Sequence, residues 1–516
     1  MKKNILLSVG LFLFAGMMLH AQQNKPGLYA GDAFQGEMDL YDSLDWIAAN
    51  AQDGGEYSIV LGASIAASSS VLDYGGKSVT VSLKSSGAVL QVSYATRSPS
   101  SSLFTVKEGV TFVLEKGVEL VGRPSASRPP VTVDGGNFIM NGGAVKDSNV
   151  DHSRDWFGGG VDIVRGTFTM NDGVISGNVA GSGAGVNVGE STTFTMNGGV
   201  ISENSIGDYF SPSFGGGVFV NKNATFTMNG GTISRNSASY GNGNGYGGGG
   251  VYVNGTFTLV DGIISNNDCS QKDYSTRGNG GGVCVSGNGV FVMQGGRISN
   301  NSDTGVYLTS NIMSKYVHVF GKGKITMDGG IITGNAGGGV CIEGSFEMNN
   351  GTISKNNAAS GAGVYVNSGT FTMNDGSIIG NTASGYSSQY FYGGGGVYIR
   401  DKFIMNGGVI SENAAINEAT GGGGVFVDGG IFTMNDGTIS KNSAIRSGGG
   451  VLVTDGTFTK SNTAGVIYGG DAAEDKANKA DQYGHAVHTK NGSRDTTARA
   501  TMALDSRKQG AEGGWE

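Results

Sequence analysis

The chain has 516 residues, of which 95 are Gly and only 6 are Pro, and its formal net charge is −8. Collagen is excluded because Gly follows no three-residue period and Pro is scarce, and simple disorder is disfavoured because 38% of the residues are hydrophobic. A sequence pI of about 5.3 and the lack of a basic run speak against a nucleic-acid partner.

Residues 1–21 read as a bacterial signal peptide. Lys2 and Lys3 form the positive n-region, the run from Ile5 to Leu19 forms the apolar h-region, and Ala21 fits the cleavage position. No later stretch approaches the run of about eighteen apolar residues that a transmembrane helix needs. We therefore expect an exported protein, extracellular or at the bacterial cell surface or outer membrane, with no transmembrane span.

Residues 22–135 differ from the rest of the chain and are predicted to form an N-terminal cap with irregular opening coils. Residues 41–52 have the spacing of an amphipathic helix with Leu44, Ile47 and Ala48 on its apolar face. Such a helix would plug the open end of a repeat array, where an unpaired β edge invites aggregation. The other predicted features are a helix cap at Asp39 or Ser43 and strands over 57–61, 78–83, 103–106 and 110–114.

Two phrases recur through residues 136–470. One reads Phe-Thr-Met-Asn-Asp-Gly-Val-Ile-Ser-Gly-Asn at 168–178, and the other reads Gly-Gly-Gly-Val-Phe-Val at 215–220. Starts of the first phrase are 21 to 34 residues apart, a period that indicates a solenoid, and the frequent Gly residues exclude helical repeats. Copies of the first phrase begin at Phe168, Phe194, Phe226, Phe257, Phe291, Ile325, Phe346, Phe371, Phe403 and Phe432.

Both phrases alternate with period two, so the outer residues of Val-x-Val and of Phe-Thr-Met point one way and the middle residue points the other. Asn-Gly-Gly and Asn-Asp-Gly supply turns. Three short strands and three turns make one coil of a parallel β-helix, with about 4.8 Å between coils. Stacking then places the Phe, Met and Ile residues in interior columns, and Asn178 and its successors in a structural hydrogen-bonded ladder.

The motifs Phe-x-x-Asn and Gly-Gly-x-Ile, as at 194–201 and 403–410, resemble the short repeats of chlamydial polymorphic membrane proteins. The resemblance covers residues 138–470. It implies an all-β, right-handed parallel β-helix solenoid of the pectin-lyase-like kind, used in surface adhesion.

The middle positions of the Val-x-Val phrases form an outward column. An exposed column with so many aromatic residues could stack sugar rings or contact a protein; the alternatives are ordinary stacking between coils or cover by neighbouring loops. Cys284 and Cys341 lie two coils apart in it, too far for a disulfide, and with Cys269 we expect small buried residues. In order, the column is Asp162, Asn187, Phe219, Tyr252, Cys284, Tyr307, Cys341, Tyr365, Tyr398, Phe426 and Leu452, of which Phe219, Tyr252, Tyr365 and Tyr398 are candidate binding residues.

Long loops leave the coil at one corner, directly after the Asn ladder. They are rich in Tyr, Ser, Gly and Asn, the composition of adaptable paratopes, and loops on a rigid scaffold often carry function. Tolerated drift of surface loops is the alternative. The candidate binding residues here are Tyr209, Phe210, Tyr240, Tyr246, Tyr274, Tyr386, Tyr390 and Tyr392.

The sequence offers less for catalysis. Glycoside hydrolysis needs two carboxylates at a defined separation. The best local cluster is Asp151, His152, Arg154 and Asp155, followed by Asp162, and a solvated loop explains it more simply. No Cys or His spacing suggests a metal, so neither cofactor nor metal is expected. Turn formation explains Asp172, Asp375 and Asp436, and His318, His485 and His488 are expected at the surface.

Residues 471–516 lose the repeat and are predicted to form a variant coil, a cap and a loose tail. Gly484-His-Ala-Val487 resembles a last Gly-Gly-Gly-Val phrase.

The first functional hypothesis is a monomeric, adhesin-like binding protein without enzymatic activity, whose loops and column contact a glycan or a host protein. The alternatives are a polysaccharide lyase or glycoside hydrolase of the pectin-lyase-like fold, and a passive structural surface protein.

Overall fold

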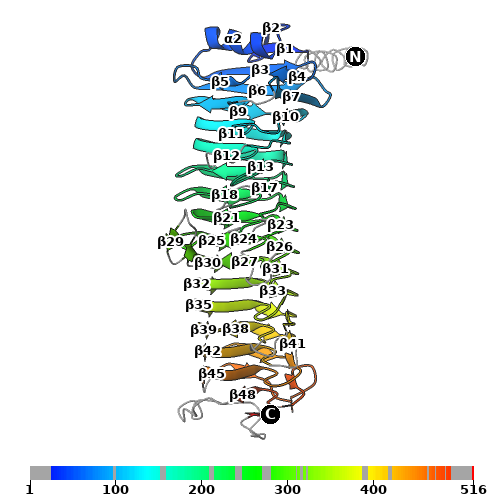
Figure 1. Cartoon of the computed structure of the whole chain (residues 1–516), viewed down its shortest axis with the longest axis vertical. Coiled ribbons are helices and arrows are strands. Elements are labelled where there is room, and N and C mark those ends of the chain that lie inside the picture. Colours follow the sequence, from blue (N-terminus) through cyan, green and yellow to red (C-terminus); the bar gives the residue numbers. More distant parts are fainter. Residues whose placement is uncertain are drawn as a thin grey trace, which may run out of the picture.

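The computed structural model forms a parallel β-solenoid of about 12 turns, which Figure 1 shows as one long stack of coils. Among the described residues, no helix has the length and apolar character to span a membrane. The predicted signal peptide lies outside the described residues. These are 25–96, 100–150, 158–207, 214–238, 247–269, 280–309, 323–385, 393–416, 421–461, 464–470, 472–482 and 484–489, with the backbone of 311–313, 318–320 and 514–515.

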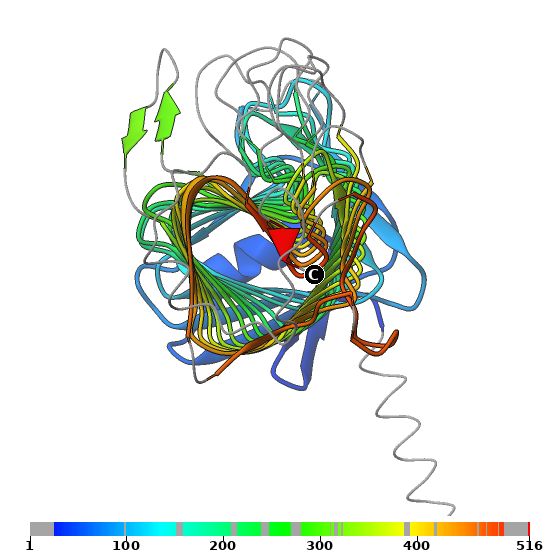
Figure 2. The ribbon, with the colours of Figure 1, turned by 90° about the horizontal axis from the view of Figure 1, so that it is seen from below.

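One regular coil contains three short strands, as predicted. In the coil of β14 (Val186–Val188), β15 (Thr193–Met196) and β16 (Val200–Ser202), each strand pairs in parallel with the matching strand of the next coil. We call the three stacks the Val sheet, the Phe sheet and the Ile sheet. Seen from one end, the coils overlay as a three-sided tube (Figure 2).

The other strands of the stack follow the same plan. Two strands run through all three sheets, β11 (Val131–Lys146) and β12 (Val161–Ser176), and four run through the Val and Phe sheets, β32 (Val340–Met348), β35 (Val364–Met373), β42 (Val425–Met434) and β45 (Val451–Lys460). The Val sheet also contains β18 (Val218–Val220), β21 (Val251–Val253), β24 (Val283–Val285), β27 (Val306–Leu308), β38 (Val397–Ile399) and β48 (Val487–Thr489). The Phe sheet also contains β19 (Thr225–Met228), β22 (Thr256–Leu259), β25 (Val290–Met293), β30 (Lys324–Met327) and β39 (Lys402–Met405). The Ile sheet also contains β20 (Thr232–Ser234), β23 (Ile263–Ser265), β26 (Arg297–Ser299), β31 (Ile331–Thr333), β33 (Thr352–Ser354), β36 (Ser377–Ile379), β40 (Val409–Ser411), β43 (Thr438–Ser440) and β46 (Val466–Ile467).

Short strands outside the tube were not predicted. Five of them pair in parallel as a narrow stack that we call the Ala sheet, made of β34 (Asn357–Ala358), β37 (Thr382–Ala383), β41 (Ala414–Ala415), β44 (Ser443–Ala444) and β47 (Lys479–Ala480). The remaining pairs are β13 (Val179–Ala180) with β17 (Ser205–Ile206), β28 (Asn311–Met313) with β29 (His318–Phe320), and β49 (Gly514–Trp515) with β48.

A helix covers the N-terminal end of the tube, as the sequence indicated. Helix α2 (Leu40–Asn50) starts at Asp39, whose carboxylate accepts the backbone N–H of Asp42 at 2.9 Å. Leu40 and Ile47 are buried in the core of the tube, and Figure 2 shows the helix lying across the end of the tube. Ala48 was predicted on the buried face but is exposed, because the buried stripe runs through Leu40, Ser43 and Ile47 and leaves Ala48 on the solvent side.

The opening coils use more strands than predicted. β1 (Gly27–Ala30) pairs antiparallel with both β2 (Ala33–Gly36) and β3 (Gly55–Leu61), so the first edge of the stack is closed by a hairpin. Parallel coils then follow through β4 (Ile65–Ala67), β5 (Ser70–Leu72), β6 (Val79–Ser85), β7 (Leu90–Tyr94), β8 (Phe104–Lys107), β9 (Val110–Leu114) and β10 (Val118–Val121).

The tube interior consists of the predicted columns. Successive rings of Phe168, Phe194, Phe226 and Phe257 lie 4.7 Å apart between centroids, with interplanar angles of 4° to 6°. Burying one such side chain contributes about 1.5–3 kcal/mol. The Met and Ile columns are equally buried, so each coil repeats one pattern of side chains above the last.

Candidate functional site: the loop corner and the column beneath it

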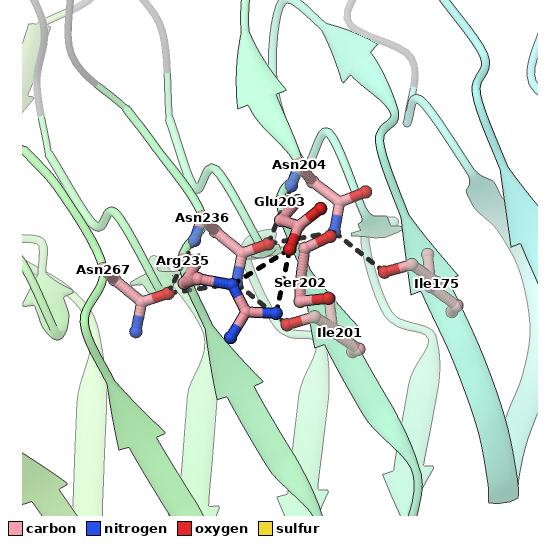
Figure 3. A network of polar contacts seen from close by, with 8 residues as sticks. All are labelled: Ile175, Ile201, Ser202, Glu203, Asn204, Arg235, Asn236 and Asn267. Atoms are coloured by element: carbon pink, nitrogen blue, oxygen red, sulfur yellow. Dashed lines mark hydrogen bonds and ion pairs between the residues drawn. The ribbon is translucent and has the colours of Figure 1, made fainter.

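The Asn ladder forms the inner edge of the corner from which the long loops leave. Asn204 donates through Nδ2 to Asn236 Oδ1 at 2.9 Å and to the carbonyl oxygen of Ile175 at 3.0 Å, while its backbone N–H donates to the same Asn236 oxygen at 3.1 Å (Figure 3). The pattern continues past Asn442 to Asn478, one coil further than predicted. Because these side chains are buried and hydrogen-bonded to both neighbouring coils, the corner is rigid along its length.

From Asn178 to Asn442, the residue before each ladder Asn has a positive φ and turns the chain outward. Glu203 and Arg235 have φ of 59° and 55°, in the left-handed region that non-glycine residues rarely adopt. Their exposed side chains form an ion pair across neighbouring coils, with Arg235 Nη2 2.9 Å from Glu203 Oε1 (Figure 3). The same left-handed turn recurs before later ladder residues, so successive loops leave the tube in the same way.

Loops of different length begin and end at this corner. After the ladder, the chain passes through the Ala sheet or an equivalent bridge, and it returns through the Gly-Gly-Gly phrase to the Val sheet. The candidate residues Tyr209, Phe210, Tyr240, Tyr246, Tyr274, Tyr386, Tyr390 and Tyr392 all lie outside the described residues.

The outward column has the predicted register but is not exposed. Its members pair coil by coil from Asp162↔Asn187 to Phe426↔Leu452, and the column continues to His488. Four of its aromatic residues are candidate binding residues, and their exposed fractions are 6% for Phe219, 2% for Tyr252, 7% for Tyr365 and 2% for Tyr398. The expectation of an exposed aromatic surface was therefore wrong, and His488, expected at the surface, is 4% exposed.

The column forms a second hydrophobic core between the Val sheet and the returning chain. Phe214 precedes a Gly-Gly-Gly phrase and packs on the column, with its ring centroid 4.4 Å from that of Tyr252. Gly361 (φ 56°) approaches so closely that a Cβ would lie 2.9 Å from the Cβ atoms of Tyr365 and Tyr398. Two of the alternatives that the sequence left open therefore describe the column: its residues stack on their equivalents in neighbouring coils, and neighbouring segments of the chain cover it.

Polar side chains border the column where the Val sheet ends. The hydroxyl of Tyr398 donates to Asp428, and Arg400 Nε lies 3.9 Å from the same carboxylate. Burial and this carboxylate raise the pKa of the Tyr398 phenol well above its ordinary value. Two coils earlier, Glu343 accepts from the hydroxyl of Tyr307 at 3.3 Å. These groups hold the phenol ends of the column in place.

Asp162 is a buried carboxyl at the N-terminal end of the column. Its Oδ1 accepts from Asn187 Nδ2 at 2.7 Å, and its Oδ2 finds no hydrogen-bond partner among the described residues. Loss of hydration raises the pKa of Asp162 to about 6, although the Asn187 hydrogen bond and the charge of Arg128 lower it in part. Its predicted neighbours Asp151, His152, Arg154 and Asp155 lie outside the described residues.

The Asp residues of the Asn-Asp-Gly turns bind backbone N–H groups of their own turns. Asp172 binds the backbone N–H of Gly173 at 2.8 Å, as a turn residue does, and Asp375 and Asp436 make the same bond. Asp428 and Asp455 are in register on neighbouring coils, but the first is held by Tyr398 and the second by the N–H of Gly456. Within the described residues, no group of three or more His, Cys, Asp or Glu side chains could hold a metal ion.

The three cysteines are buried, as expected. Tyr307 separates Cys284 from Cys341 in the column, which confirms the predicted spacing of two coils. Burial raises the pKa of the Cys284 thiol well above its ordinary value, so it stays protonated.

A second amide ladder was missed by the sequence reasoning. Exposed Asn171, Asn197 and Asn229 follow the Met column, and each donates through Nδ2 to the Oδ1 of the preceding coil at 2.8–2.9 Å. The signal was present, because the Phe-x-x-Asn motif repeats this Asn at a constant distance from the Phe.

No protein-family model, curated protein or solved structure matches this chain.

Proposed function

We propose that this chain is an exported, adhesin-like binding protein that presents variable loops from one corner of a rigid solenoid to a glycan or a host protein. The observation that carries the proposal is the construction of the corner. Loops of unequal length start from a continuous, buried Asn ladder and return over a buried aromatic core. A rigid base of this kind lowers the entropy that loops lose on binding.

The column has a different part in this proposal from the one the sequence suggested. Phe219, Tyr252, Tyr365 and Tyr398 support the loops from beneath, and the contacts to a ligand fall to the loop residues. Recurrence of Phe-x-x-Asn and Gly-Gly-x-Ile supports a relationship to polymorphic membrane proteins and to the pectin-lyase-like fold, which remains part of the proposal. The signal-peptide pattern supports export.

A binding panel tests the proposal. Purified residues 22–516 are applied to immobilised soluble polysaccharides and matrix proteins, and each well is scored for retained protein and for released sugar. We expect retention on at least one surface, and at least a tenfold loss when Tyr386, Tyr390 and Tyr392 are changed to Ser. The matched control changes Thr326, Thr372 and Thr433 to Ser, which lie on the Phe sheet and not at the loop corner.

The panel also separates the alternatives. New reducing ends or unsaturated sugars would show a polysaccharide-degrading enzyme and would overturn the binding proposal. If the protein shows the cooperative unfolding of a folded chain and is retained on no surface, the result would favour a passive structural protein. The close cover of the column also supports that function.

A further inference from the structure

One part of the outer face of the Phe sheet carries a regular grid of threonines. In four consecutive coils, both outward positions that flank the buried Phe are Thr, and all eight side chains are at least partly exposed. They pair in register without a bulge through β12, β15, β19 and β22. We call this set the Thr face, made of Thr167, Thr169, Thr193, Thr195, Thr225, Thr227, Thr256 and Thr258.

The Thr face stands on an evenly spaced part of the core. Beneath it, the three Phe–Phe spacings are identical at 4.7 Å, and the rings are parallel within 6°. The next step, from Phe257 to Phe291, widens to 5.1 Å and tilts by 20°, at the coil where Val replaces both threonines. Even spacing below makes the hydroxyl and methyl groups above repeat at a constant interval.

The exposed amide ladder adds a third row to this grid. Asn171, Asn197 and Asn229 follow the Thr residues of the same strands and hold their amides in a fixed orientation. The grid therefore offers hydroxyl donors and acceptors, methyl groups and amides, and it carries no charge, although the chain has a net charge of −8.

Strand propensity alone does not account for the Thr face. Thr is favoured on exposed strands, but the same two columns accept Lys324, Glu347 and Lys402 in later coils. Lys324 and Glu347 form an ion pair there, at 3.2 Å. Charged residues are thus compatible with the fold at these positions, and the four coils of the Thr face carry none there.

We propose that the Thr face binds the surface of an uncharged, crystalline polysaccharide. A single Thr hydroxyl gains little by exchanging water for a ligand, so a flexible chain would lose more entropy than these contacts return. A crystalline surface is already ordered and presents hydroxyl groups and apolar ring faces at regular intervals. Many weak contacts then add together along the face without a further ordering cost. Neutrality of the face matches an uncharged ligand, since no charge must be desolvated.

The test is depletion of the protein from solution by microcrystalline cellulose and by crystalline chitin. Purified residues 22–516 should be depleted by at least one of them, and Thr193→Lys with Thr225→Lys should weaken binding at least tenfold. Both substitutions place Lys in the column that Lys324 and Lys402 already occupy, so the fold is expected to persist. The matched control is Thr370→Lys with Thr457→Lys, which makes the same charge change in the same column outside the four coils.

Each other outcome overturns the inference. The proposal is wrong if the unsubstituted protein stays in solution with both solids, or if the Thr193/Thr225 variant and the control bind equally. Inhibition of ice recrystallisation that is lost in the Thr193/Thr225 variant, without depletion by either solid, would assign the grid to ice. The loop variant that combines Tyr386→Ser, Tyr390→Ser and Tyr392→Ser should still bind the solids, so the loop-corner proposal and this one can fail separately.

Discussion

The tube interior and the outer column are built from the same coils and follow different rules. Inside, Phe, Met and Ile recur almost unchanged, because each residue packs on its equivalents one coil above and one coil below, in a core that repeats from coil to coil. Outside, the Val-sheet column changes from Asp162 through aromatic residues and cysteines to His488. The returning chain that covers this column differs in sequence from coil to coil, so each column residue packs in a different environment. An environment that repeats in every coil favours the same residue each time, whereas an environment that varies allows different residues.

Removal of one ring from the interior is expected to have the largest effect. Phe226→Ala leaves a cavity between rings that lie 4.7 Å away on both sides, and it should lower the free energy of unfolding by about 4 kcal/mol. Guanidinium denaturation measures this loss. Phe426→Ala removes the same kind of ring from the column, and an equal or larger loss of unfolding free energy there would contradict the expectation that the tube interior contributes most to stability.

The ladder that separates the two regions should be nearly as sensitive. Asn236→Ala removes the acceptor of the Asn204 backbone N–H and the donor to the Ile201 carbonyl, both buried. We expect a loss of about 3 kcal/mol, because unsatisfied buried polar groups cost about 1–3 kcal/mol each. Asn197→Ala in the exposed ladder is the control, measured in the same denaturation series, and should cost much less since water replaces its partners.

The polar end of the column predicts a dependence on pH. The pKa of Asp162 is about 6 in the folded chain and near 3.8 when unfolded, so its favourable contribution is complete below pH 4 and is lost as the pH rises through 6. The difference amounts to about 3 kcal/mol. Denaturation at pH 4 and pH 7 should show this fall in the original chain and not in Asp162→Asn.

Asp172→Asn serves as the control for that experiment. It alters an exposed turn at a position where another coil has Asn350, so it should leave the pH profile unchanged. A profile that is the same for Asp162→Asn and the original chain would show that Asp162 does not titrate in this range.

The smallest expected effect concerns the border of the column. Tyr398→Phe removes the hydrogen bond to Asp428 and keeps the stacking on Tyr365, whose ring centroid is 4.8 Å away. We expect a loss of about 1 kcal/mol, measured by the same denaturation. Tyr398→Ala should cost several times more if the ring, rather than the hydroxyl, holds the corner together.

Much of the fold could be predicted because the same residue pattern occurs in every regular coil. Phe168, Asn178 and their successors recur at constant offsets, so register, interior columns and ladder follow from period-two alternation. The N-terminal strands β4, β5 and β7 could not be predicted as readily, since each occurs once and lacks the repeated phrase. The exposed Asn ladder was visible in the spacing but has no apolar pattern to identify it.

For this protein, the order of residues determined which side chains face inward, which face outward and which meet on neighbouring coils. Only the tertiary structure decided that Tyr252 and Tyr398 are buried and that the Thr face is open. The physical reason is that alternation along a strand sets the direction of a side chain, whereas burial depends on what other chain passes over it. The returning Gly-rich segments cover the Val sheet, and among the described residues no segment covers the Thr face.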